Sequence, residues 1–290
     1  MLKIFNRRRE AVSEFSVALT HLKDDKLAIS ALGFIAFLLV VAIFADFISP
    51  YDPIKVSIPD RLSPPSWEHP FGADGFGRDI LSRIIHGTRI SLIVGFQVIA
   101  ISLLIGTITG AVAGYYGGKI DEVIMRVADV FLAFPGLILA ISIMAVFGPG
   151  IFNVVIALTL VNWAGYARVI RSQVLSVKGL EYIESSRVMG AADVTIIIDH
   201  VVPNSIAPLI VLATIGIGWA ILAEAGLSFL GLGVRPPTPS WGAMVAAGRL
   251  RLLQAPHIVT IPGLVIAITV LAFNLLGDGL RDALDPKLRI

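Results

Sequence analysis

The sequence predicts an all-α, polytopic membrane protein with six transmembrane helices, on the basis of its composition, its apolar runs and the placement of its charges. Of the 290 residues, 56% are hydrophobic and 15% are charged, and the mean hydropathy is +0.85. Soluble domains usually carry about 25% charged residues, so this chain has too little charge to cover a water-facing surface.

Five charge-free runs are long enough to cross a bilayer as helices. The longest of them, 130–167, is interrupted by Gly148-Pro149-Gly150, a strong turn signal, and therefore predicts two helices joined by a hairpin. Pro135-Gly136 and Pro262-Gly263 predict kinks inside the third and sixth spans. The predicted spans are approximately 27–47, 91–113, 125–147, 151–170, 206–230 and 258–278.

The distribution of the 23 Lys and Arg residues predicts the orientation, because cytoplasmic loops carry an excess of these residues. Most of them fall on the inside if both termini are cytoplasmic, which predicts a multi-pass membrane protein with both termini in the cytoplasm. The predicted regions are a cytoplasmic tail at 1–26, a first span and extracytoplasmic segment at 27–88, a five-helix core at 89–280 that includes a cytoplasmic loop at about 171–203, and a cytoplasmic tail at 281–290.

Several classes of function find no support in the residues. The chain has no Cys, its five His residues show no metal-ligand spacing, and no G-x4-G-K-[ST] phosphate loop occurs. No nucleophile–base pair is evident, and a net charge of +2 does not indicate nucleic-acid binding. The sequence therefore predicts no catalytic residue, no metal site and no cofactor in this chain.

The segment Glu181–Pro203 is a polar stretch between two apolar runs, and it contains Glu184, Gly190 and Pro203 at spacings of six and thirteen residues. A helix that starts near Glu181 would expose Glu184, Ser185 and Arg187 to water. The same helix would offer an apolar contact face made of Ile183, Val188 and Met189. Gly190 would let the chain turn or let another backbone approach closely.

A second motif, HPFGADGFGRDILSRIIHGTRISL, precedes the second span at 69–92. Gly-Phe-Gly-Arg-Asp indicates a turn into a helix, with Asp79 at the N-terminal end, where negative charge is favourable. Asp74, Gly77, Arg78 and Asp79 are candidates either for a structural cap of the outer segment or for docking of a protein outside the membrane.

Two further features lie inside the predicted spans. Gly106, Gly110 and Gly114 recur every four residues and predict a helix face that another helix approaches closely, either in this chain or in a partner. Glu224 is an ionisable residue within the fifth span, where charge is costly, so it is a candidate to line a pore or to contact a substrate amine.

These motifs resemble those of ABC-importer permeases. The spacing of Glu184, Gly190 and Pro203 is similar to the EAA loop, E-A-A-x3-G-x9-I-x-L-P, although Ser185 and Ser186 replace its alanines. The block at 69–92 resembles the G-T-D-x-x-G-R-D-x-x-S-R-x-x-x-G-x-R-x-S-L stretch of the dipeptide, oligopeptide and nickel group. The segments 229–244 and 273–290 are similar to the C-type subunit of that group.

The resemblance implies the type I ABC-importer permease fold, a location in the cell inner membrane and a set of partners. These are a homologous second permease, two ATPases that bind ATP and Mg²⁺, an extracytoplasmic substrate-binding protein and the lipid bilayer. Small peptides are the expected substrates, with a nickel chelate or glutathione as alternatives. An ion-coupled secondary transporter is the alternative from another class. The residues that the resemblance assigns to ATPase coupling are Glu184, Ser185, Ser186, Arg187, Gly190 and Ala191.

Overall fold

The computed structural model describes residues 24–204 and 206–284, so most of each predicted terminal tail lies outside the described residues. Within these ranges the chain is helical, apart from loops and one antiparallel bridge between Ala73 and Asp79. The helices are α2 (Lys26–Ile43), α3 (Ala45–Ile48), α4 (Ile80–Tyr116), α5 (Gly118–Leu132), α6 (Gly136–Phe147), α7 (Ile151–Val177), α8 (Glu181–Val188), α9 (Asp193–Ile196), α10 (Val202–Asn204), α11 (Ile206–Phe229), α12 (Trp241–Gly248) and α13 (His257–Leu284), with a π-helical turn at Ile197–Val201 and a 3-10 turn at Arg249–Arg251.

Five of these helices, α2, α4, α7, α11 and α13, are long and apolar enough to cross a membrane, and α5 and α6 make a sixth span only if they are taken together as one broken span. The sixth differs from its prediction, since α5 and α6 meet at 88° across a short break. The cause is Pro135, because proline disfavours helical geometry in the residue before it and cannot donate a backbone hydrogen bond. Where the sequence predicted a kink at Pro135-Gly136, the structure therefore has a break between two helices. At Pro262, by contrast, α13 continues as one helix.

Helix α4 begins at Ile80, directly after Asp79, where the sequence predicted a helix start, and it therefore extends beyond the span that was predicted to begin near residue 91. Its first turns contain charged residues, which hydropathy excludes from a span, but these residues have partners in the segments around them. Arg83 donates to the Pro53 carbonyl at 2.8 Å, and Arg89 donates to the Ala42 carbonyl at 2.8 Å. Such contacts are not visible in a local stretch of sequence.

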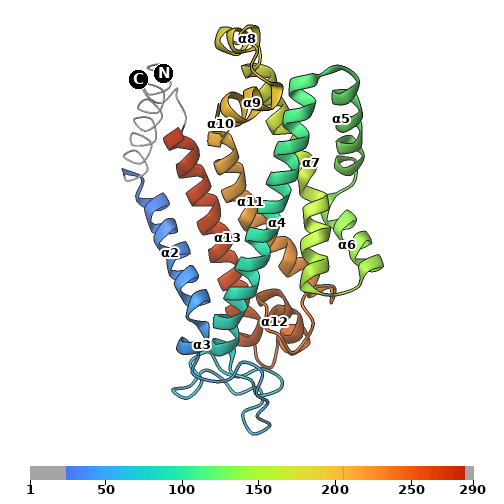
Figure 1. Ribbon diagram of the computed structural model, residues 1–290. Helices are drawn as coiled ribbons and strands as arrows, with labels where there is room; N and C mark the ends of the chain where they lie inside the picture. The colour runs from blue at the N-terminus through green and yellow to red at the C-terminus, as the bar shows by residue number, and fades with distance from the viewer. Residues whose placement is uncertain (1–23, 205, 285–290) are drawn as a thin grey trace.

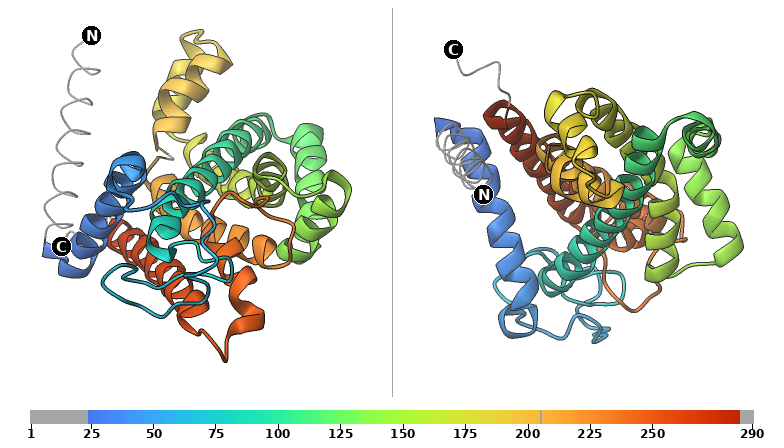
Figure 2. Two further views of the ribbon diagram at one scale, coloured as in Figure 1. Left: turned by 90° about the horizontal axis from the view of Figure 1, so that it is seen from below. Right: turned by 45° about the horizontal axis from the view of Figure 1, so that its top comes forward.

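The long helices run between two ends of the molecule (Figure 1). At one end lie α8, α9, the last turn of α4 and the C-terminal end of α13. At the other end lie the segment 49–79, α12 and the hairpin between α6 and α7. The N-terminal part of α2 packs beside the C-terminal part of α13, where Ala28 and Ala283 are buried together. Figure 2 shows the same bundle from two further directions.

Helices α4 and α7 share the most extensive contact between two helices of the described residues, and the glycine face predicted for the second span lies in it. A Cβ atom built at Gly106 would lie 2.5 Å from the Tyr166 Cβ, and one at Gly110 would lie 2.3 Å from the Ala167 carbonyl oxygen. Gly114 is equally tight against α7. The glycines therefore serve packing within this chain, and the alternative of a partner subunit at this face is excluded.

Candidate functional site

Helix α8 forms where the sequence places charges that complement a helix dipole. Glu181 and Glu184 lie in its first turn and Arg187 in its last turn. Negative charge near the N-terminus and positive charge near the C-terminus both stabilise a helix. The helix starts at the predicted residue, directly after Leu180, whose backbone is extended.

The end of α8 depends on Gly190. This residue has φ +82°, a conformation that L side chains rarely adopt. Its N–H donates to the Arg187 carbonyl at 3.0 Å, and the Ala191 N–H donates to the Ser186 carbonyl at 3.1 Å. This pair of bonds is the Schellman motif, which typically has glycine at this position. A Cβ at Gly190 would meet nothing within 4 Å, so within this chain the glycine is needed for its conformation and not for space.

The apolar residues of α8 point in two directions. Ile183 is 0% exposed and belongs to a cluster with Tyr115 of α4, Val174 of α7 and Ile196 of α9. Val188 and the following Met189 are 88% and 79% exposed. The prediction of one shared apolar face is therefore wrong, because positions 183 and 188 are about 140° apart around a helix. Ile183 anchors α8 to the bundle, whereas Val188 and Met189 point outward.

Polar contacts also tie α8 to the bundle. The Arg187 guanidinium lies 5.4 Å from the centre of the Tyr115 ring, and the Tyr115 hydroxyl donates to Asp193 Oδ1 at 2.7 Å. Hydrogen bonding with Tyr115 raises the pKa of the Arg187 guanidinium above its usual range. Lys178 Nζ donates to the Gly114 carbonyl at the end of α4, at 2.9 Å.

Of the residues assigned to coupling, Glu184, Ser185, Arg187 and Gly190 are exposed, whereas Ser186 and Ala191 are half-buried. The Ser185 and Ser186 hydroxyls donate to the backbone carbonyls four residues earlier in α8. The sequence did not identify Tyr115, Lys178 and Asp193 as members of this region, because only the folded chain brings them together.

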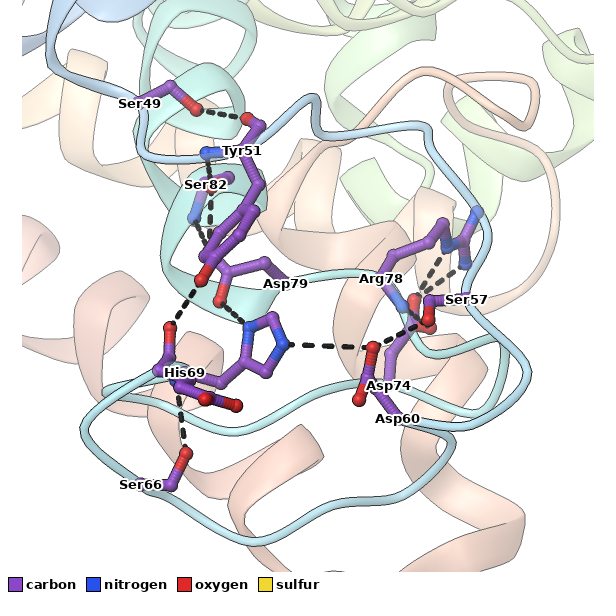
Figure 3. A network of polar contacts seen from close by, with 11 residues as sticks. Ser49, Tyr51, Ser57, Asp60, Ser66, His69, Asp74, Arg78, Asp79 and Ser82 are labelled. Atoms are coloured by element: carbon purple, nitrogen blue, oxygen red, sulfur yellow. Dashed lines mark hydrogen bonds and ion pairs between the residues drawn. The ribbon is translucent and has the colours of Figure 1, made fainter.

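At the opposite end, the segment 49–79 is organised by buried carboxylates (Figure 3). Asp74 is 6% exposed and accepts hydrogen bonds from the Phe76 and Arg78 backbone N–H groups at 2.8 and 3.1 Å. It also forms a two-pronged ion pair with the Arg78 guanidinium, both contacts being 2.7 Å. Arg83 lies 3.6 Å from the same carboxylate.

Asp79 is the N-cap of α4, as its predicted position implied. One carboxylate oxygen accepts from the Ser82 N–H and hydroxyl at 2.7 and 2.6 Å, and the other lies 2.9 Å from His69 Nδ1 (Figure 3). The Tyr51 N–H donates to the Ser82 oxygen at 3.1 Å, and the Tyr51 hydroxyl donates to the Glu68 carbonyl at 2.9 Å. The outer segment is thereby fastened to the start of α4.

Gly77 completes this outer network, which consists of Tyr51, His69, Asp74, Gly77, Arg78, Asp79, Ser82 and Arg83. Gly77 has φ +71°, and a Cβ built on it would lie 1.6 Å from the Ser57 carbonyl oxygen. Asp74, Arg78 and Asp79 are all buried and bonded inside the chain. Of the two predicted roles, this geometry favours the structural one over docking.

Glu224 lies inside the subunit and not on an open surface. It is 0% exposed, and Ser228 donates to its Oε1 at 2.7 Å. Helix α12, which the sequence did not predict, packs closely against this part of α11. A Cβ built on Gly242 of α12 would lie 2.4 Å from the Cα of Ala225, the residue after Glu224. Glu224 is not exposed to a path in this conformation, and its role in lining a pore or contacting a substrate amine stays a prediction. No group of three His, Asp or Glu residues suited to a metal ion occurs within 24–204 and 206–284.

Comparison with known proteins places this architecture in a family. A family model described as "Binding-protein-dependent transport system inner membrane component" matches residues 106–290. A second, described as "N-terminal TM domain of oligopeptide transport permease C", matches residues 13–65. The fold and these matches define a multi-pass membrane permease.

Similar proteins of known annotation support the same class. A glutathione transport system permease protein of Pectobacterium atrosepticum is 48% identical over 264 residues, which cover 91% of this chain and 88% of the relative. A dipeptide transport system permease protein of Alkalihalophilus pseudofirmus is 46% identical over 279 residues, covering 96% and 92%. A glutathione transport system permease protein of Escherichia coli O157:H7 is 45% identical over 305 residues, covering 99% and 100%.

Solved structures confirm the fold. An inward-facing conformation of the MetNI methionine ABC transporter matches with a TM-score of 0.57 at 18% identity, over 71% of this chain and 98% of that chain. An amino acid ABC transporter matches with a TM-score of 0.52 at 16% identity, over 69% and 92%. The chain belongs to the family of binding-protein-dependent transport permeases, the membrane subunits of ABC importers, which are transport proteins and not enzymes.

Proposed function

We propose that this chain forms half of the translocation path for small peptides in an ATP-driven importer. The other components are a homologous second permease, two ATPases and an extracytoplasmic substrate-binding protein. The names of the similar permeases support this substrate class, since dipeptides and glutathione are both small peptides. These names favour small peptides over a nickel chelate as the substrate.

The observation that carries the proposal is the outward presentation of Val188 and Met189 beside an anchored α8. Exposed apolar side chains outside the spans are stabilised when a protein partner covers them. We assign this surface to the ATPases, which bind ATP and Mg²⁺ and hydrolyse the nucleotide. This assignment places α8 and both termini in the cytoplasm, and the segment 48–88 outside the cell membrane.

The contacts of α8 supply a route for coupling. Closure of the two ATPases would move α8, and Ile183 would pass that movement to the ends of α4 and α7 through their shared cluster. The Arg187–Tyr115 contact joins α8 to α4 a second time. A rigid-body rearrangement of the permeases would then alternate access to the path.

The test is a double variant, Val188→Asp with Met189→Asp, in the complete transporter. Burial of two apolar side chains is worth enough that we expect at least about a tenfold loss of co-purified ATPase. Uptake of a dipeptide should be lost, whereas the amount of permease in the membrane should not change. Glu184→Lys reverses an exposed charge on the same helix and should weaken the same association.

The matched control is Ile58→Asp, since Ile58 is 79% exposed but lies in the outer segment. This variant should retain normal ATPase association. If the double variant retains both ATPase association and uptake, α8 is only a connecting helix and the proposal is wrong.

A further inference from the structure

One face of α4 is exposed along most of its length within the membrane. The residues recur at helical spacing and form a stripe with a length of about 23 Å. Six of its seven members are apolar, and the large ones are between 39% and 61% exposed. The members of this stripe are Ile93, Phe96, Gln97, Ala100, Ile101, Leu104 and Ile108.

The other faces of α4 are already occupied within the chain. Gly106 and Gly110 contact α7, and a Cβ at Gly95 would lie 3.0 Å from Ile221 of α11. Gln97 is nine positions from Gly106, which places it about 180° away around the helix. Apart from the contact of the Phe96 ring with Phe273 of α13, the stripe is therefore the face of α4 that the helices among the described residues leave exposed.

Gln97 lies near the middle of the membrane. Ile99 is level with the centre of α11, since a Cβ at Gly216 would lie 3.1 Å from its Cδ1. The Phe96 ring contacts the Phe273 ring in the central part of α13, with centroids 6.2 Å apart. Gln97 sits between these two levels and also near the middle of α4.

The Gln97 side chain is exposed at this depth, and within residues 24–204 and 206–284 it makes no hydrogen bond of its own. An unpaired amide in hydrocarbon costs roughly 4–8 kcal/mol, so a lipid neighbour is unfavourable. The other stripe residues are apolar, which does not suit a water-filled path. A second transmembrane helix packed on the stripe would cover its apolar residues. It would also give the Gln97 amide a partner, because glutamine side chains hydrogen-bond across helices in membranes.

We propose that the α4 stripe is the surface that packs against a transmembrane helix of the second permease, with Gln97 hydrogen-bonded to that helix at mid-membrane depth. The inference rests on the proposed function, because it requires a second permease. It adds the surface and the residue that hold the two subunits together.

The experiment uses the complete transporter in membranes, with a photo-crosslinking amino acid placed at Ala100 or Leu104 of the stripe. Leu264 of α13, which is 60% exposed, is the matched control position. We expect adducts with the second permease from both stripe positions, in greater yield than from Leu264. If neither stripe position gives such an adduct although the second permease co-purifies, the inference is overturned. If no second permease co-purifies with the unmodified chain, the proposed function itself fails.

A second measurement tests the amide. Gln97→Leu should weaken pairing of the two permeases by about 3- to 30-fold, the range that one interhelical hydrogen bond provides, and Gln97→Asn should lose less. Pairing is measured by co-purification in increasing detergent. Normal pairing with reduced uptake in Gln97→Leu would place the amide in the path, and normal pairing with normal uptake would place it against lipid. Either result would overturn the inference.

Discussion

The outer network and the α8 end of the molecule differ in the side chains that they bury and expose. The outer network buries charged groups and bonds them within the chain, as Asp74, Arg78 and Asp79 show. The α8 end leaves Val188 and Met189 exposed, although both are apolar. Charged groups that are bonded within the chain are not available to a partner, whereas an exposed apolar pair on an anchored helix is suited to bind one.

The glycines of the two regions show the same contrast. Gly77 and Gly190 both have positive φ, but only Gly77 has a neighbour close enough to exclude a Cβ. Backbone atoms of the outer segment leave no space for a side chain at Gly77, whereas no atom of the subunit lies within 4 Å of a Cβ at Gly190. Changes at the outer network should therefore act on stability, and changes at the α8 end should divide between stability and partner binding.

The largest effect is expected for Asp74→Ala. This change removes the carboxylate that pairs with Arg78 and approaches Arg83, and it leaves those guanidinium groups buried without a counter-charge. Loss of one partner of a buried ion pair typically costs about 3–5 kcal/mol. Chemical denaturation of the purified permease in detergent should show this loss.

Glu68→Ala is the control, since Glu68 is an exposed carboxylate of the same segment and its side chain makes no bond within residues 24–204 and 206–284. It should leave the free energy of unfolding almost unchanged. A stable Asp74→Ala protein that fails only to bind the substrate-binding protein would show that the outer network serves docking.

A smaller effect is expected for Ile183→Ala, which opens a cavity where α8 meets α4 and α7. Truncation of a buried Ile to Ala typically costs 2–5 kcal/mol, and the open surroundings of α8 favour a value of about 2–3 kcal/mol. Val188→Ala removes an apolar side chain from the exposed face of the same helix and should not change the free energy of unfolding. Thermal melts of both variants, alone and with the ATPases, separate anchoring from binding. If Ile183→Ala and Val188→Ala destabilise the isolated permease equally, Ile183 is not the residue that anchors α8.

The sequence predicted those features that depend on local residue chemistry. The apolar runs predicted the spans, Asp79 predicted the start of α4, and the polar segment that begins at Glu181 predicted the start of α8. Gly148-Pro149-Gly150 predicted the hairpin between α6 and α7. Each of these signals is confined to a few consecutive residues, and a turn or a cap is determined at that scale.

Features that depend on contacts distant in the sequence were missed. The burial of Glu224 depends on α12, which follows it only after a loop, and the direction of the glycine face depends on α7. The extra turns of α4 depend on carbonyls at Ala42 and Pro53. Hydropathy treats a charged residue as an end of a span, but a charged residue with a distant partner can continue the helix.

The smallest effect, and the one that best distinguishes the two roles of the α8 end, is expected for Gly190→Ala. Gly190 and Gly179 flank α8, and a Cβ on either would meet nothing within 4 Å, but only Gly190 has positive φ. A non-glycine residue in this left-handed conformation costs about 1–2 kcal/mol, so Gly190→Ala should lower the free energy of unfolding by that amount. Gly179→Ala should be neutral or stabilising by up to about 1 kcal/mol, since it restricts only the unfolded chain.

Pull-down of the ATPases with the same two variants completes the comparison. If Gly190 serves only to end the helix, the small loss of stability should leave ATPase association near normal in both variants. If the ATPase packs against this turn, an added methyl group would block the contact, and Gly190→Ala would lose association by more than its stability explains. Equal stability of the two variants would show that φ does not determine the need for glycine here. The first outcome is the expected one, because the positive φ of Gly190 at the end of α8 by itself accounts for a glycine there.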